Sequence, residues 1–117
     1  MTSITNIHNA LSYSWGKNCK SFLLNESDGL SVKLETMPPD TTEQLHYHNH
    51  ATQVFFILTG NAAFIVDGNS FELQANDSLT ILPGQKHLIK NESNRDLTFL
   101  VISQPDTQND RINLAPG

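Results

Sequence analysis

The stretch "HYHNHATQVFFILTG", residues 46–60, decides the fold prediction for this chain. Histidines occupy every second position at its start, an apolar run follows, and a glycine ends it. In a β-strand, side chains two positions apart point to the same side. His46 and His48 therefore share one face, and two imidazoles so placed can bind one metal ion. A bare His-x-His pair is weak evidence, so an exposed polar face without a metal is the alternative.

The same period of two continues outside this stretch. Apolar and polar residues alternate in "LSVKLET", residues 30–36, and two further runs join through the turn residues of "DG" in "AAFIVDGNSFEL", residues 62–73. "LTFLVIS", residues 97–103, is apolar on both faces, and no window has the spacing of an amphipathic helix. Many short strands predict a single all-β domain over residues 1–117. We expect an N-terminal arm at about residues 1–20 and a surface tail at about residues 104–117.

Composition excludes several classes of partner. The net charge of -5 and the scattered lysines and arginines argue against binding to nucleic acid. No segment is long and apolar enough for a membrane span, and the N-terminus has no secretory pattern. The single cysteine, Cys19, cannot form an internal disulfide, so we expect a reducing, cytoplasmic location.

Two spaced patterns surround the histidines. The first runs from Asp40 through His46, His48 and Gln53 to Gly60, with five, one, four and six residues between successive members.

The second pattern lies downstream. It runs from Asn76 through Leu82, Gly84 and His87 to Asn91, with five, one, two and three residues between successive members.

These spacings resemble the two motifs of the cupin family, G-x5-H-x-H-x3,4-E-x6-G and G-x5-P-x-G-x2-H-x3-N, over residues 40–91. The chain is most similar to small single-domain, type-2 cupins. The resemblance implies a single jelly-roll β-barrel, the cupin-like double-stranded β-helix. It also implies one divalent transition metal, Fe, Mn, Ni, Zn or Co, bound by His46, His48, Gln53 and His87.

The departures from the motifs have physical consequences. Asp40 and Asn76 replace glycines, and both residue types tolerate left-handed backbone. Gln53 replaces a glutamate, and its neutral amide oxygen leaves the charge of the metal uncompensated. This favours Lewis-acid chemistry and an anionic or chelating ligand, without excluding oxygen chemistry. Alternatively, Gln53 hydrogen-bonds a metal-bound water.

No catalytic residue is identified by the pattern. His50 continues the alternation of the histidines, but the family motif has no ligand there, so we expect it on the surface or beside the ligands. His50, Tyr47 and a metal-bound hydroxide are candidate bases. Tyr13 and Trp15 are expected to be packing residues.

Function is less determined than fold, because cupins include dioxygenases, isomerases, epimerases, storage proteins and ligand sensors. We predict a metal-dependent enzyme, of isomerase, tautomerase or dioxygenase type, that acts on a small oxygen-rich or carboxylate-bearing molecule. The alternative is a non-catalytic module that binds a metal or a small molecule.

Assembly is predicted from the apolar run. Val54, Phe56 and Leu58 point away from the side of Gln53, so they need cover from the chain itself or from a second subunit. We expect a homodimer.

Overall fold

The computed structural model describes residues 2–115, which form strands and turns without a helix. The strands are β1 (Ser12–Trp15), β2 (Cys19–Ser27), β3 (Leu30–Met37), β4 (Thr41–Thr42), β5 (His46–His48), β6 (Thr52–Thr59), β7 (Asn61–Val66), β8 (Asn69–Gln74), β9 (Ser78–Ile81), β10 (His87–Asn91), β11 (Leu97–Gln104) and β12 (Arg111–Asn113). No helix among the described residues has the length and apolar character that crossing a bilayer requires.

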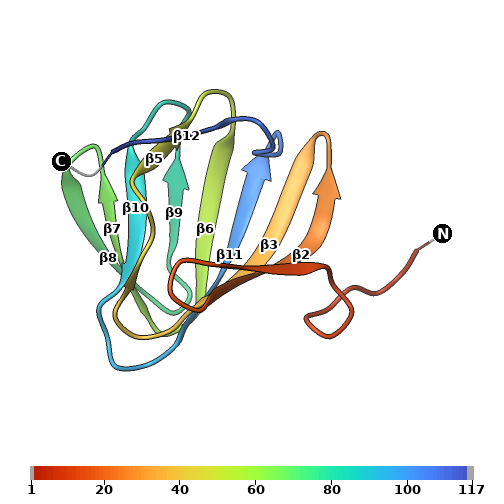
Figure 1. Ribbon diagram of the computed structural model, residues 1–117, viewed down its shortest axis with the longest axis horizontal. Helices are drawn as coiled ribbons and strands as arrows, with labels where there is room; N and C mark the ends of the chain where they lie inside the picture. The colour runs from red at the N-terminus through yellow and green to blue at the C-terminus, as the bar shows by residue number, and fades with distance from the viewer. Residues whose placement is uncertain (1, 116–117) are drawn as a thin grey trace.

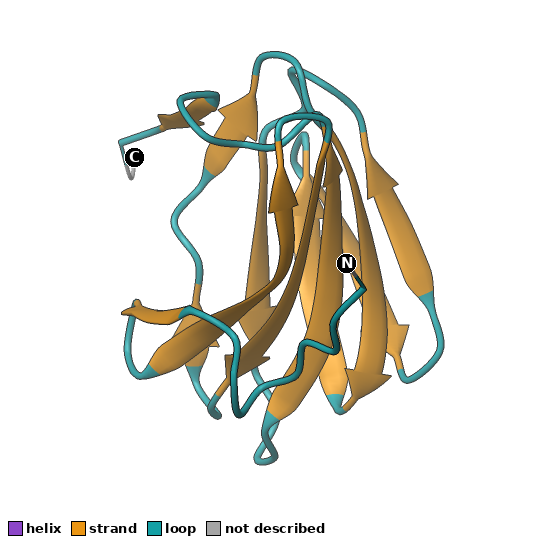
Figure 2. Cartoon of the chain, turned by 90° about the vertical axis from the view of Figure 1, so that its right-hand side faces the viewer, coloured by secondary structure: helices purple, strands orange, loops and turns teal. Residues whose placement is uncertain are grey.

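The strands form two antiparallel sheets that face each other (Figures 1 and 2). One has the order β1-β2-β3-β11-β6-β9, and the other has the order β12-β5-β10-β7-β8, with β4 paired to β10. From β5 to β11 the chain passes repeatedly from one sheet to the other. This is the jelly-roll, double-stranded β-helix arrangement, which confirms the predicted fold class.

The space between the sheets is apolar in one part and polar in another. Along β6 the buried side chains are Ile57, Phe55 and then Gln53, and along β11 Val101 is followed by Ser103. Gln53 lies opposite Ser103 in the register of these strands. The apolar part is the core of the domain, and the polar part contains the candidate site.

Over most of β3, polar side chains face the interior of the domain and apolar side chains face outward. Ser31 and Glu35 are buried, whereas Leu34 on the opposite face is only half-buried. Leu34 pairs with Leu100, and Leu100 pairs with Phe56, so the outer face of this sheet is apolar across three strands. The alternation in the sequence predicted which residues share a face. It did not predict which of the two faces lies inside the domain.

The residues expected to tolerate left-handed backbone have positive φ angles in the structure. Asp67 and Gly68 have φ angles of 49° and 84° and form the two-residue turn between β7 and β8. Asp40 and Asn76, the replacements for motif glycines, have φ angles of 58° and 75°. At Gly60, a Cβ would lie 2.6 Å from a backbone oxygen, so the last glycine of the first motif permits a close approach.

Both ends of the chain add strands. In the N-terminal arm, β1 forms the edge of one sheet (Figure 1). The segment after residue 104 was expected to lie over the surface, and most of its residues are exposed. It also supplies β12, which pairs with the histidine strand β5, and the buried residue Asp110.

Candidate metal centre

Three histidines from two neighbouring strands are buried together. His46 and His48 lie on β5 and His87 lies on β10, where it pairs directly with His46. All three side chains are less than 5% exposed, and one ring nitrogen from each lies within 4.8 Å of the others. Donors on opposite sides of one ion, with bonds near 2.1 Å, are about 4.2 Å apart. The cluster therefore has nearly the dimensions of a metal site.

Backbone carbonyls orient two of the rings. His46 Nδ1 lies 2.8 Å from the oxygen of Gln44, and His87 Nδ1 lies 2.9 Å from the oxygen of Gln85. A carbonyl oxygen only accepts, so in both rings Nδ1 carries the proton and donates it. The Nε2 atom of each neutral ring then keeps a lone pair, as in histidines that bind metals.

The third ring lacks such partners. Among residues 2–115, neither ring nitrogen of His48 has a hydrogen-bond partner, although both atoms are buried. A buried polar atom without a partner is unfavourable by about 1–3 kcal/mol. A metal ion would satisfy one nitrogen of His48, and so the three histidines fit the metal that the motifs imply.

Gln53 lies beside the cluster. Its Oε1 is 3.2 Å from His87 Nε2, and its Nε2 donates to Ser103 Oγ at 3.0 Å. In this orientation the amide oxygen faces the lone pair of His87, and a cation between the two acceptors would relieve the contact. The opposite amide orientation would let Gln53 donate to His87. Direct ligation by Gln53 therefore stays a prediction.

Burial keeps the three rings neutral. It lowers the pKa of His46 to about 3 and that of His48 to about 4, and it also lowers the pKa of His87. The positive charge of Arg111 acts in the same direction on each ring. Each neutral ring thus keeps one nitrogen without a proton at neutral pH.

His46 and His48 line a cavity of about 140 Å³, here called the histidine cavity, whereas His87 is fully buried next to them. Its walls include charged side chains, Lys33, Glu35, Glu43 and Arg111, and also Tyr13. Sequence reasoning missed the charged residues and assigned Tyr13 to packing. The alternation of β3 was a usable signal, because it put Lys33 and Glu35 on one face.

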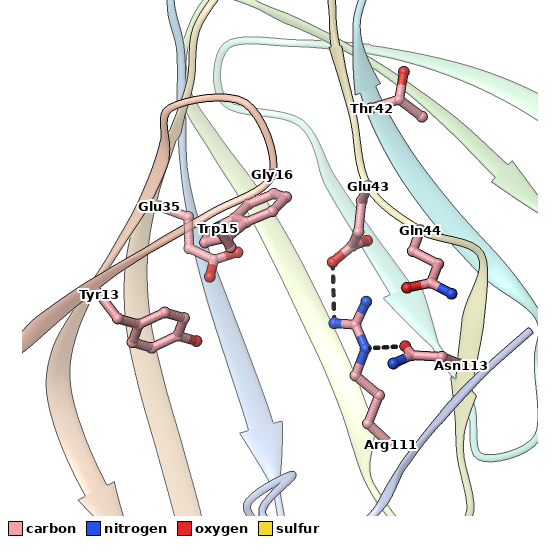
Figure 3. A pocket seen from close by; sticks show the side chains of 9 residues that line it. All are labelled: Tyr13, Trp15, Gly16, Glu35, Thr42, Glu43, Gln44, Arg111 and Asn113. Atoms are coloured by element: carbon pink, nitrogen blue, oxygen red, sulfur yellow. Dashed lines mark hydrogen bonds and ion pairs between the residues drawn. The ribbon is translucent and has the colours of Figure 1, made fainter.

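The two carboxyl groups are largely buried. Glu43 Oε2 lies 3.5 Å from Arg111 Nη1 (Figure 3). Burial raises the pKa of Glu43 to about 8, against the opposing effect of Arg111. Burial also raises the pKa of Glu35, although its carboxylate accepts a hydrogen bond from Ser21. Burial thus favours the protonated form of both groups.

The other predicted candidates lie elsewhere. His50 is exposed and does not belong to the histidine cluster. Tyr47 is half-buried, and the alternation of β5 directs it away from His46 and His48. Neither residue lines the histidine cavity.

Asp110 fixes the loop that joins the histidines of β5 to Gln53 on β6. Its carboxylate accepts hydrogen bonds from the backbone N–H groups of Asn49, His50 and Ala51, at 3.0–3.1 Å. Burial acts to raise the pKa of Asp110, but these donors outweigh it and hold the pKa below its usual value. The segment that carries β12 therefore anchors the loop that follows His48.

Replacing the carboxylate of Asp110 by an amide tests this role. We expect Asp110→Asn to lower the free energy of unfolding at pH 7 by about 1–3 kcal/mol, because buried N–H groups lose an acceptor. A lowered pKa stabilises the folded state fully above the unfolded pKa of about 3.9, and this stabilisation is lost as pH falls through the folded pKa. The difference between the two proteins should thus shrink as the pH falls below the unfolded pKa and through the lower folded pKa of Asp110.

Urea unfolding at several pH values measures this difference. Asp28→Asn, at an exposed turn, is the matched control and should resemble the wild type throughout. If Asp110→Asn lowers the free energy of unfolding by the same amount at every pH, the charge of the Asp110 carboxylate is not involved.

Comparison with known proteins agrees with this geometry. A family profile described as "Cupin domain" matches residues 33–103. The "Oxalate-binding protein" of Thermotoga maritima is 32% identical over 66 residues, which are 56% of this chain and 54% of that protein. The chain spans about half the length of the curated relatives it matches.

Solved structures share the fold at low sequence identity. KdgF from Halomonas sp. superposes with a TM-score of 0.83 at 12% identity, covering 93% of this chain and 98% of that one. A double-stranded β-helix protein from Klebsiella pneumoniae gives 0.81 at 17% identity, covering 99% and 100%. With the family profile covering most of its length and the histidines of the two motifs on neighbouring, paired strands, this chain belongs to the cupin family.

Proposed function

We propose that this protein is a metal-dependent enzyme that acts on a small molecule bearing a carboxylate or several oxygens. The observation that carries the proposal is the buried group of His46, His48 and His87. The first two of these histidines line a cavity that also has two cationic side chains, Lys33 and Arg111. In the proposal, Gln53 completes the metal-binding set.

The donor set suits a range of metals. Neutral imidazole nitrogens and one amide oxygen are ligands for Fe, Mn, Ni, Zn or Co, so the identity of the ion stays open. When bound, the metal would supply a Lewis acid for a carboxylate or a pair of chelating oxygens.

Charge supports an anionic ligand. When all are ionised, Lys33 and Arg111 balance Glu35 and Glu43, so the charge of a divalent ion would remain uncompensated. Phe55 contributes an apolar wall, which strengthens electrostatic attraction inside the cavity.

Two buried carboxyl groups favour an enzyme over a simple receptor. Glu35 and Glu43 repel a bound anion when ionised, so a site that only binds anions gains nothing from them. Placed on the wall of the same cavity, they suit the transfer of a proton to or from the substrate. Isomerisation or tautomerisation therefore ranks ahead of dioxygenation.

A non-catalytic binding module is the second candidate. The curated relative from Thermotoga maritima is named for binding oxalate. Binding of small carboxylates without turnover of any of them would favour this candidate.

Elemental analysis tests the metal site. The purified protein should carry close to one divalent transition-metal ion per chain. Changing His46, His48 or His87 to alanine should weaken metal binding by about 100-fold or more, because groups that merely orient ligands already contribute about 10–100-fold. His50→Ala, at an exposed position nearby, should bind metal as the wild type does. Substoichiometric metal after reconstitution would refute the site.

Calorimetric titration with oxalate tests the charge at Gln53. We expect Gln53→Glu to retain or tighten the metal but to bind oxalate more weakly, because the new carboxylate cancels one unit of attracting charge. Gln74→Glu adds the same charge at an exposed position on β8 and should bind oxalate normally. Equal oxalate affinities in wild type and Gln53→Glu would contradict the charge argument.

We also propose a cytoplasmic homodimer. Cys19 is free and buried, which suits a reducing compartment. The apolar outer face that includes Leu34, Leu100 and Phe56 would be covered by a second copy.

Light scattering at micromolar concentration tests the dimer. Phe56→Glu should give monomers with nearly unchanged metal content, because the charge falls on the outer face of β6. Thr59→Glu, at an exposed position of the same strand, is the control and should remain dimeric. A wild-type monomer would overturn the assembly.

A further inference from the structure

A second, larger cavity of about 360 Å³ adjoins the histidine cavity, and it is called the outer cavity below. The two cavities share four wall residues, Tyr13, Glu35, Glu43 and Arg111. Figure 3 shows the outer cavity between the β1–β2 turn, with Trp15, and the opposite sheet, with Gln44 and Asn113. A molecule bound at the histidines can therefore extend past Arg111 into this space.

The wall of the outer cavity is rich in hydrogen-bonding groups. The amides of Gln44 and Asn113 and the hydroxyl of Thr42 line it on one side, and the indole ring of Trp15 lies on the other. Two buried wall atoms, Trp15 Nε1 and Glu43 Oε1, have no hydrogen-bond partner among residues 2–115. One is a donor and the other an acceptor when ionised, and a hydroxyl group can serve both.

Other kinds of occupant fit this wall poorly. An apolar group would leave Trp15 Nε1 and Glu43 Oε1 without partners. A second carboxylate would face Glu35 and Glu43 as well as Arg111, and an amine would face the same mixed charges, so the wall favours neither sign. An uncharged chain with several hydroxyl groups meets none of these penalties, and its C–H faces can pack on the ring of Trp15.

We propose that the outer cavity binds the hydroxylated end of a ligand whose carboxylate end lies in the histidine cavity. The ligand is then a polyhydroxy carboxylate of sugar-acid size rather than a two-carbon diacid. This assignment rests on the proposed function, because the carboxylate end is held by the histidine cavity.

Two acids with the same head group test the assignment. Glycolate and gluconate both carry an α-hydroxycarboxylate, and only gluconate continues into a hydroxylated chain. Calorimetric titration of the metal-loaded protein should show gluconate binding at least tenfold more tightly than glycolate. Thr42→Trp, which fills the outer cavity, should abolish this preference while leaving glycolate affinity unchanged. Thr80→Trp, at an exposed threonine on β9, should keep the preference.

The outcomes separate the two proposals. Equal affinities for glycolate and gluconate in the wild type would overturn the outer cavity as a binding compartment and leave the proposed function standing. If the metal-loaded protein binds neither these acids nor oxalate, the proposed function fails and this inference fails with it. A Thr42→Trp variant that retains metal, binds glycolate and still prefers gluconate would also overturn the assignment.

Discussion

The burial of three imidazole rings against one another is the constraint on which the site depends. Their ring centroids lie 4.3–5.8 Å apart, and all three rings are buried. They cannot all carry a positive charge, because the charges would repel one another and would lack water. Neutral rings still need partners for their nitrogens. His46 and His87 each donate to the carbonyl of the residue two positions earlier, which leaves one lone pair per ring directed elsewhere. With His48 wholly unpaired among the described residues, the cluster is most stable around a cation.

The C-terminal segment supports the histidine cluster and also brings a positive charge to it. Asp110 holds the loop that follows His48, and the next residue, Arg111, reaches the histidine cavity and pairs with Glu43. Strand β12 also pairs with β5 along its whole length. A displacement of this segment would thus disturb the ligand loop and the electrostatics of the cavity together.

Local features of the sequence predicted the fold and the histidines well. Period-two alternation and fixed motif spacings depend on neighbours along the chain, and they placed His46 and His48 on one strand face. The remaining wall residues converge from distant segments. Asp110, for example, contacts backbone groups 59–61 positions away, and no short-range pattern signals such a contact. Alternation in β3 likewise could not tell that its polar face lies inside, because burial depends on the opposite sheet.

The charged wall changes the meaning of glutamine at position 53. From the sequence alone, Gln53 leaves a metal ion uncompensated in an otherwise apolar pocket. In the structure, Glu35 and Glu43 already supply two carboxyl groups, whose charges Lys33 and Arg111 balance when all four are ionised. A glutamate at position 53 would add a third carboxylate to a cavity of about 140 Å³ and offset half the charge of a divalent ion. In the proposed function, the neutral amide would therefore preserve anion attraction in a cavity that also keeps acidic groups for proton transfer, two requirements that oppose each other in so small a volume.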